Sequence, residues 1–345
     1  WSCVVAPEGR LLRPTMYMSK NWMDNVWSWD HCFNALALSG SMPRLAWDTF
    51  MIMFDYQDEY GALPDIINDH GVSRVFVKPP VHGWTLSKLM ERMHLSAQQL
   101  EEVYDKLGRL TNWWTVYRAG TNGLPYYYHG NDSGWDNSTA FKATMPISTP
   151  ELCGYLVLQM RTLARVAGML GKVTEQRLWN TRADELKQKI VENYWDGKQL
   201  FGLDRKGNRV YSQSLLPMMT IAMGEELPDD IRDYVVGNIL KPAERGGWLT
   251  KWGVATEQPD SEFYVSDGYW RGPIWAPSTL LIADGLYRAG YKQEASMLAR
   301  RFSELCMVGG FAENYDALTG QGLRDRAYTW TSSSFLVLMR DYLTD

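Results

Sequence analysis

Three segments that lie far apart in the sequence combine charged side chains with tryptophan, tyrosine and glycine. They cover residues 134–138, 268–275 and 313–316. Two carboxyl groups that flank a glycosidic bond can hydrolyse it by acid and base catalysis. Aromatic rings stack on flat apolar surfaces such as the faces of sugar rings. This combination of residue types indicates a carbohydrate cleft.

Asp136 and Glu313 are the carboxyl groups that we expect to carry this chemistry. Trp135 should exclude water from Asp136, which raises the pKa of a carboxyl group and suits a general acid. The polar neighbours of Glu313 should keep it ionised, as a general base requires. Arg271 can contact sugar hydroxyls or pair with a carboxylate. Taken singly, these residues could equally be a turn acid, a helix cap and a structural ion-pair partner.

Further candidate substrate-binding residues occur in the same loops. We expect Trp27, Trp29 and Trp270 to line the innermost sugar subsite, and Asp30 to accept hydrogen bonds from sugar hydroxyls. Trp27 and Trp29 could instead be core residues at the start of a helix. The predicted substrate-binding set is Trp22, Trp27, Trp29, Asp30, Trp84, Asp132, Trp135, Asn137, Tyr269, Trp270, Arg271, Gly272 and Trp330.

Helices must position these residues, because apolar side chains recur at helical spacing along most of the chain. Helical pairs are predicted to begin near residues 30, 82, 150, 213 and 273, with a further helix from about 331 to the end. Turns inside the pairs are short, and the long connections between the pairs carry the candidate residues. Six starting points predict an all-α fold, an (α/α)6 barrel that forms one catalytic domain over residues 1–345. Function should reside in the long loops.

Local signals support these boundaries. Residues 148–151 read Ser-Thr-Pro-Glu, which is typical of a helix start, and Gly171 ends that helix. Among the long connections only residues 199–211 have the pattern of a β-hairpin, with Asp204 and Gly207 at the turn.

Composition excludes several classes of protein. The chain has 345 residues, 22% of them charged, and a net charge of -5, so it has no basic excess for binding nucleic acid or an anionic membrane. No apolar run approaches the ~18 residues of a membrane helix. The 16 Trp and 19 Tyr exceed what we expect a core alone to need. The expected partner is a small sugar substrate, and the sequence leaves the oligomeric state open.

We expect no cofactor and no metal site. The four cysteines are scattered without a Cys-x-x-Cys pair, and the five histidines lack the His-Glu-x-x-His spacing of a catalytic zinc site. Residues 229–233 spell Asp-Asp-x-x-Asp, the pattern of magnesium-diphosphate sites. Since they follow a proline at a predicted helix start, where acids favour the helix dipole, we interpret them as helix-start acids.

Further expectations concern the cellular context and the ends of the chain. Few cysteines and many methionines favour a reducing cytoplasm. The two glycosylation sequons at Asn131 and Asn137 flank the expected acid, so a glycan would obstruct the cleft. The chain begins at Trp1 rather than Met, so we expect an upstream segment.

The segments 134–138, 268–275 and 313–316, together with Trp-Ser-Trp-Asp at 27–30 and Trp-Thr at 330–331, resemble glycoside hydrolase family 63 and, more distantly, the family 37 trehalases. The likeness spans roughly residues 20 to 335. It implies an inverting α-glycosidase on an (α/α)6 barrel, with Asp136 as general acid and Glu313 as general base. One departure is Asp132, where the family often has the longer glutamate.

Within the wider family, α-glucosidases and hydrolases of mannosylglycerate or glucosylglycerate look most similar. The resemblance therefore implies cleavage of a terminal α-glucosyl or α-mannosyl bond in a small aromatic-lined cleft. Two alternatives remain open at this point. The barrel could bind carbohydrate without cleaving it, or it could be a trehalase-type disaccharide hydrolase.

Overall fold

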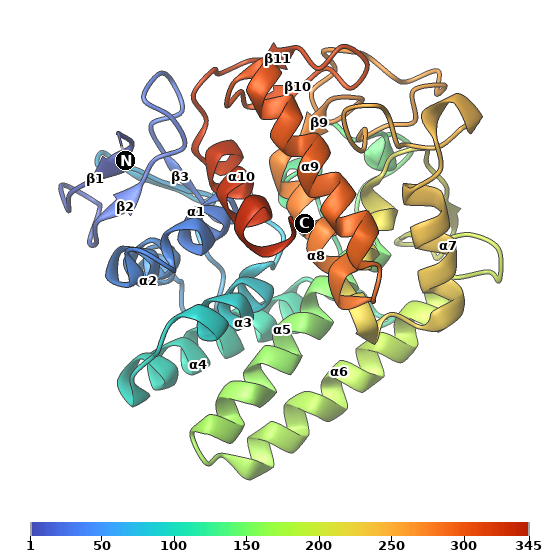
Figure 1. Cartoon of the computed structure of the whole chain (residues 1–345). Helices are drawn as coiled ribbons and strands as arrows, with labels where there is room; N and C mark the ends of the chain where they lie inside the picture. The colour runs from blue at the N-terminus through green and yellow to red at the C-terminus, as the bar shows by residue number, and fades with distance from the viewer. Residues whose placement is uncertain (1, 344–345) are drawn as a thin grey trace. The chain divides into compact units, whose positions relative to one another are not determined.

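The computed structural model describes residues 2–343, and its regular structure is mostly helical (Figure 1). Residue contacts divide the chain into two units. The first comprises residues 1–127, 131–134 and 152–192, and the second comprises 128–130, 135–151 and 193–345. Neither unit is a continuous stretch of sequence, because the chain passes between them several times. That the whole chain acts as one catalytic domain stays a prediction.

Helical pairs dominate the first unit. They are α1 (Asp30–Leu38) with α2 (Pro43–Met51), α3 (His82–Arg92) with α4 (Ala97–Asn112), and α5 (Pro150–Met169) with α6 (Val173–Tyr194), whose outer ends belong to the second unit. Helix α1 packs against both α2 and α3. The predicted starts at residues 30, 82 and 150 are confirmed.

Sequence signals explain where these helices begin and end. Ser96 and Gln99 form a reciprocal capping box at the start of α4. Pro150 is the first residue of α5, a position that needs no backbone N–H. Gly171 has φ +72° in the short turn between α5 and α6, a conformation that costs glycine little.

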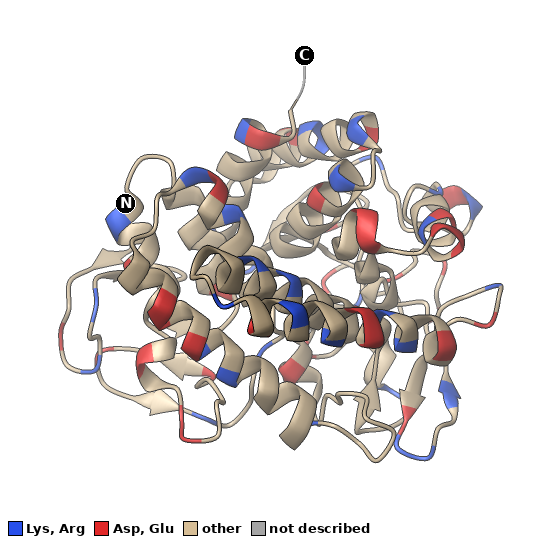
Figure 2. Cartoon of the chain, turned by 90° about the horizontal axis from the view of Figure 1, so that it is seen from below, with Lys and Arg blue, Asp and Glu red and all other residues tan. Residues whose placement is uncertain are grey.

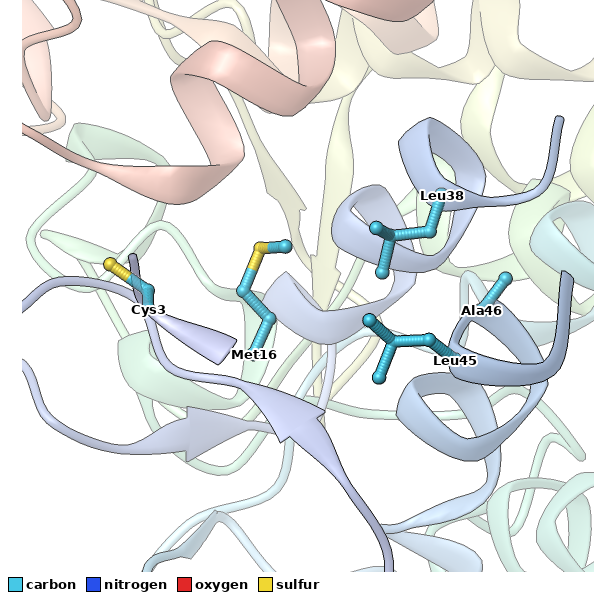
Figure 3. Close-up of a cluster of buried hydrophobic side chains, with 5 residues drawn as sticks. All are labelled: Cys3, Met16, Leu38, Leu45 and Ala46. Carbon is cyan, nitrogen blue, oxygen red and sulfur yellow. The ribbon is translucent and has the colours of Figure 1, made fainter. Parts of the chain in front are cut away.

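The N-terminal strands β1 (Val4–Val5) and β2 (Thr15–Met16) pair antiparallel and cover the first helical pair. Figure 3 shows the small apolar core between them, in which Met16 of β2 lies beside Leu38 of α1 and Leu45 of α2, with Cys3 and Ala46 completing the cluster. Burial of these side chains stabilises the docking of this hairpin on α1 and α2.

The second unit contains α7 (Asp229–Ile239), α8 (Ala276–Arg288), α9 (Lys292–Gly309) and α10 (Thr329–Asp341). Helix α8 packs on α9 and α10, as Figure 1 also shows. The pair predicted near residue 213 is modified, because its first member is the 3-10 helix η5 (Leu216–Glu226), interrupted at Gly224, which has φ +60°. Asp229 pairs with Arg232 at 2.7 Å in the first turn of α7, in line with its interpretation as a helix-start acid.

Shorter helical segments lie in the connections. They are η1 (Phe54–Tyr56), the π-helical η2 (Trp113–Tyr117), η3 (Gly130–Ser133), η4 (Thr139–Phe141) and η6 (Ala243–Arg245).

The long connections also form small antiparallel sheets. Strands β3 (Val26–Trp27), β4 (Ile66–Ile67) and β5 (Val72–Ser73) form one, and β6 (Ile147–Ser148), β7 (Gly202–Asp204) and β8 (Arg209–Val210) form another. Strands β9 (Ile274–Trp275), β10 (Asn314–Tyr315) and β11 (Gly322–Leu323) form the third. The predicted hairpin at 199–211 is confirmed as β7 and β8. The expectation that it was the only one was wrong, since two-residue strands carry no readable alternation of apolar and polar residues.

No helix within residues 2–343 combines the length and apolar character needed to cross a membrane. Figure 2 shows Lys and Arg interspersed with Asp and Glu along the helices.

Glu151, near the start of α5, is a buried acid with an unusual environment. It is fully buried, and one carboxyl oxygen accepts a 2.6 Å hydrogen bond from the Thr149 hydroxyl. Among the described residues, the other oxygen has no hydrogen-bond partner. Burial raises the pKa of Glu151 from 4.5 to about 8. The carboxyl group is therefore largely protonated in the folded chain at neutral pH.

This environment predicts a pH-dependent stability. A carboxyl group whose pKa is higher in the folded state stabilises the fold at low pH, and this contribution is lost as the pH rises from about 4.5 to 8. We expect Glu151→Gln to remove a slope of up to about 1.4 kcal/mol per pH unit in that window. Denaturant unfolding at pH 5, 6.5 and 8 measures it. The control is Glu175→Gln, an exposed first-turn acid of α6; equal slopes in both variants would contradict the prediction.

Candidate active site

Asp136 borders a pocket of about 390 Å³ in the second unit. The pocket is formed by the connection between Tyr128 and α5 together with the segment that precedes α8. Its lining residues are His129, Gly130, Asp136, Asn137, Ser138, Thr139, Phe141, Lys142, Met145, Phe263 and Arg271. The sequence-predicted residues Asp136, Asn137 and Arg271 therefore share one cavity.

Basic side chains outnumber acids on the wall of this pocket. Lys142, Arg271 and His129 line it, and Asp136 is the acid among the lining residues. The Lys142 ammonium lies over the Phe263 ring, 3.2 Å from its centroid. Arg271 donates through Nε and Nη2 to the Phe263 carbonyl at 3.2 and 3.1 Å. Both permanent cations thus contact Phe263, Lys142 through the ring and Arg271 through the backbone carbonyl.

Hydrogen bonds join residues 135–139, the acid segment that carries Asp136, to the loop at residues 268–270. The side chain of Asn137 donates to the Gly268 carbonyl at 3.0 Å and accepts from the Trp270 amide at 3.0 Å. Both ends of the amide are therefore engaged by backbone. Asn137 thus holds the loop beside Asp136; since it also lines the pocket, its expected contact with substrate stays a prediction.

Glu257 makes a second attachment to the same segment. It is fully buried, and its carboxylate accepts hydrogen bonds from Thr139 Oγ1 at 2.5 Å and Ser261 Oγ at 2.7 Å. Burial raises the pKa of Glu257, while these two hydroxyls and the charge of Arg271 oppose the increase. Glu257 thus ties the acid segment to the pocket wall that carries Arg271.

Glu313 is positioned by the sheet of β9, β10 and β11. Its neighbour Asn314 opens β10 and pairs with Trp275 on one side and Leu323 on the other. The Glu313 amide donates to the Asp325 carbonyl at 2.7 Å, and Trp330 Nε1 donates to the Glu313 carbonyl at 3.3 Å. The backbone of Glu313 is therefore held from both directions.

The carboxyl group of Glu313 is only 4% exposed. Burial raises its pKa from 4.5 to about 7, and the charge of Asp325 acts in the same direction. The Asp325 backbone, a hydrogen bond with the Tyr269 side chain and the charge of Arg324 oppose the increase. We had expected the polar neighbours to keep Glu313 ionised. Because the effect of burial is larger than theirs, the pKa of Glu313 is instead raised above its ordinary value.

Two residues beside Glu313 have strained backbone. Tyr269, with φ +63°, and Arg324, with φ +62°, are the non-glycine residues in the described chain that have positive φ. The Arg324 guanidinium lies 5.6 Å from the Tyr269 ring centroid and pairs with Asp267 at 2.8 Å. Such strain persists only where the surroundings enforce it, and it is frequent at functional sites.

The tryptophans of the second unit form a stack. Trp270 is parallel to Trp275 at 4.1 Å and lies 4.6 Å from Trp135, and Trp330 contacts Trp275 edge-on at 5.4 Å. Trp270 and Trp135 are each 1% exposed, and Trp330 is 4% exposed. In this structure the Trp270 ring supports the loops and has almost no exposed surface; that it stacks on sugar stays a prediction.

Gly272 also has a structural role. It has φ +148°, and a Cβ there would lie 2.5 Å from the Val265 carbonyl oxygen. Its amide donates to Thr256 Oγ1 at 3.1 Å. Only glycine fits this close approach. Tyr269 of the same loop contacts Glu313 through its side chain, as described above.

The other predicted substrate-binding residues belong to the first unit. Trp29 and Trp84 are each 3% exposed and pack around Phe33, and Asp30 is 4% exposed at the start of α1. The Trp29 ring also lies against Gly134. Trp27 is half-buried in β3, whereas Trp22 is 66% exposed. Trp29 and Trp84 are core residues in this structure, which was the alternative interpretation for Trp29.

Asp132 is committed to an ion pair. It is 2% exposed, and its carboxylate accepts from Arg118 Nη1 at 2.9 Å and from the Val77 amide at 3.2 Å. These donors orient the carboxylate, and the expected contact of Asp132 with substrate stays a prediction.

Sequence reasoning missed several residues that build the site. Lys142, His129 and Phe263 line the pocket, Glu257 anchors the acid segment, and Trp275 joins the stack to β10. Apart from Trp275, none lies in a motif that the sequence analysis singled out. A signal existed only for Trp275, which ends the segment 268–275.

The chain matches a family model described as "Mannosylglycerate hydrolase MGH1-like glycoside hydrolase domain" over residues 23–331. The chain belongs to this family. It is therefore a glycoside hydrolase, and the sequence resemblance to glycoside hydrolase family 63 is confirmed. A related member is a mannosylglycerate hydrolase of Rubrobacter radiotolerans, which is 24% identical over 404 aligned positions that cover 90% of this chain and 89% of the relative.

Solved structures show the fold of this glycoside hydrolase. A family 63 mannosylglycerate hydrolase from Thermus thermophilus, crystallised with glucose, matches with a TM-score of 0.79 at 21% identity and covers 97% of each chain. Neutral trehalase from Saccharomyces cerevisiae matches with a TM-score of 0.76 at 15% identity, over 96% of this chain and 74% of the trehalase. The predicted all-α (α/α)6-barrel fold and the distant relation to trehalases are confirmed.

The pKa of Glu313 predicts an acidic limb in the pH profile. If Glu313 is the base, kcat/KM should rise with pH through about 7, because the group must lose its proton to act. Arg324→Gln removes a cation that favours the ionised form, so the limb should move to higher pH. Arg326→Gln, which replaces an exposed arginine two residues away, is the control. A wild-type profile that is flat between pH 5 and 8 would contradict the prediction.

Proposed function

We propose that this glycoside hydrolase cleaves the terminal α-glycosidic bond of a small anionic glycoside, mannosylglycerate or glucosylglycerate, with inversion at the anomeric carbon. The observation that carries the proposal is the pocket in which Asp136 faces a wall bearing Lys142 and Arg271. The family membership and the mannosylglycerate hydrolase activity named for its relative support the same substrate class.

Asp136 is the proposed general acid. It donates its proton to the glycosidic oxygen as the bond to the anomeric carbon breaks. The departing oxygen of glycerate therefore leaves as a hydroxyl group rather than as an alkoxide. Asn137 and Glu257 support this role, because their hydrogen bonds hold the segment that carries Asp136. Misplacement of a catalytic group by about 1 Å can cost 10²-fold in rate.

Glu313 is the proposed general base. Its carboxylate takes a proton from a water molecule whose oxygen attacks the anomeric carbon from the face opposite the leaving group, which inverts the configuration. Inverting enzymes keep the two carboxyl groups about 6.5–9.5 Å apart to accommodate that water. The Tyr269 hydrogen bond and the nearby Arg324 cation favour the ionised form of Glu313 that this step requires.

Lys142 and Arg271 are the proposed contacts of the glycerate carboxylate. Arginine and lysine beside an apolar ring can bind a carboxylate through charge-assisted hydrogen bonds. A neutral disaccharide would offer these cations no carboxylate, which disfavours the trehalase-type alternative. The burial of Trp135, Trp270 and Trp330 likewise disfavours a carbohydrate-binding module without catalysis, since such a module needs exposed ring faces. A cytoplasmic location remains part of the proposal.

Substitution of the two carboxyl groups tests the mechanism. Asp136→Asn should lower turnover of a glycosylglycerate by roughly 10²–10⁴, and should affect an α-glycosyl fluoride far less, because fluoride leaves without protonation. Glu313→Gln should slow both substrates alike. Anomer-resolved NMR should detect the β-anomer of the sugar first in the wild type. Full turnover by both variants, with the fold intact by circular dichroism, would show that the pair is misassigned.

The two cations of the pocket wall, Lys142 and Arg271, predict selectivity for an anionic leaving group. Lys142→Met should raise KM for mannosylglycerate and glucosylglycerate by about tenfold, the equivalent of one charged hydrogen bond, and leave hydrolysis of an α-glycosyl fluoride unchanged. Lys206→Met replaces an exposed lysine of the β7–β8 turn and serves as the control. Trehalose turnover equal to that of the glycosylglycerates would contradict the proposed substrate class.

A further inference from the structure

Three potential metal ligands meet in the interior of the first unit. His31 and Cys32 are neighbours in α1, and His82 is the first residue of α3. Their exposed fractions are 0%, 0% and 1%. Their donor atoms all lie within 4.8 Å of one another, with His31 Nε2 and Cys32 Sγ 3.9 Å apart. The proposed catalytic steps use none of these side chains.

His82 has an unexplained environment. Among the described residues, neither of its ring nitrogens has a hydrogen-bond partner of acceptable geometry. Its neighbours include the apolar ring of Phe54, whose centroid lies 5.5 Å away, and that of Phe50 at 6.5 Å. A buried polar group without a partner costs about 1–3 kcal/mol, and such groups call for an explanation, for which a bound ion or water is one candidate.

His31 is oriented as a metal ligand would be. Its Nδ1 lies 2.9 Å from the Trp27 carbonyl, which can only accept a hydrogen bond, so the ring proton resides on Nδ1. With its proton on Nδ1, the neutral ring presents the lone pair of Nε2. Ligating histidines commonly donate their other N–H to a backbone carbonyl in this manner.

We propose that His31, Cys32 and His82 form a structural site for one thiophilic closed-shell cation, Cu⁺ or Zn²⁺. Binding would replace the thiol proton of Cys32, which passes to the buffer, by a metal–sulfur bond. His31 Nε2 and one nitrogen of His82 would supply the other two bonds. Soft thiolate together with imidazole is the ligand set that selects these ions.

The distances require a modest contraction. Bonds of about 2.0–2.3 Å place neighbouring ligand atoms about 3.5 Å apart, so the widest separation must close by about 1 Å. Rotation of the His82 ring, which would give up its interaction with the Ser28 backbone, can bring a nitrogen inwards. The nearby charge of Asp30 would also stabilise a cation bound there. Three ligands and a neutral Cu⁺–thiolate pair suit Cu⁺, whereas Zn²⁺ would need a water as its fourth ligand.

The test is metal binding by the purified full chain, which does not depend on the proposed catalytic function. The chain is stripped with a chelator under reducing conditions and titrated separately with Zn²⁺, with Cu⁺ and with Co²⁺ as a spectroscopic probe. We expect one equivalent of Cu⁺ or Zn²⁺ to remain after desalting, with a higher Tm. Co²⁺ should give a thiolate-to-metal charge-transfer band. Cys32→Ser should abolish the band, whereas Cys153→Ser, a matched buried cysteine of α5, should retain it.

X-ray absorption on the wild-type chain provides the answer if a variant does not fold. One sulfur and two imidazole nitrogens around the metal would support the site. A shell of oxygen, or of imidazole without sulfur, would indicate binding at other histidines and would overturn the proposal. It would also be overturned if no metal remained bound after desalting, or if Cys153→Ser lost the band as Cys32→Ser did.

Discussion

The second unit depends on a stack of three tryptophan rings. Trp270 lies parallel to Trp275 and close to Trp135, and all three are buried. Trp135 directly precedes Asp136, and Trp275 pairs with Asn314, the neighbour of Glu313. Large aromatic rings contribute much buried area and have defined geometry. One apolar contact therefore ties together the segments that carry both proposed catalytic carboxyl groups.

Hydrogen bonds of Asn137 and Glu257 add to the contacts made by the tryptophan stack. Asn137 joins the acid segment to the backbone of residues 268–270, and Glu257 joins the same segment to the wall that carries Arg271. The Glu257 carboxyl group is buried, where an unmade hydrogen bond is expensive. The same desolvation raises the pKa of Glu313. Rigidity and an altered proton affinity thus have a common origin in the exclusion of water from the loops.

Under the proposed function, Lys142 and Arg271 on the pocket wall would add selectivity to this scaffold. Lys142 and Arg271 approach Phe263 from different segments of the chain. Their charges lie in the same pocket as Asp136, so an anionic leaving group would be held next to the proton donor. A fold shared with trehalases can in this way serve another substrate, because function depends on the residues placed in its loops.

The sequence by itself determined the helical pairs, the (α/α)6-barrel fold and the family. Helix starts at residues 30, 82 and 150 could be predicted because apolar periodicity, caps and prolines are local signals. The candidate carboxyl groups Asp136 and Glu313 stood out for the same reason, since each lies in a compact motif.

Only the tertiary structure decided which side chains are available to a ligand. Trp29, Trp270 and Asp132 have the residue types of a sugar site, yet packing buries the two rings and Arg118 engages the acid. The pairing of β9 with β10 was likewise invisible, because two-residue strands carry no periodicity. Burial, pairing and desolvation arise from contacts between residues far apart in the chain, and no local pattern encodes them.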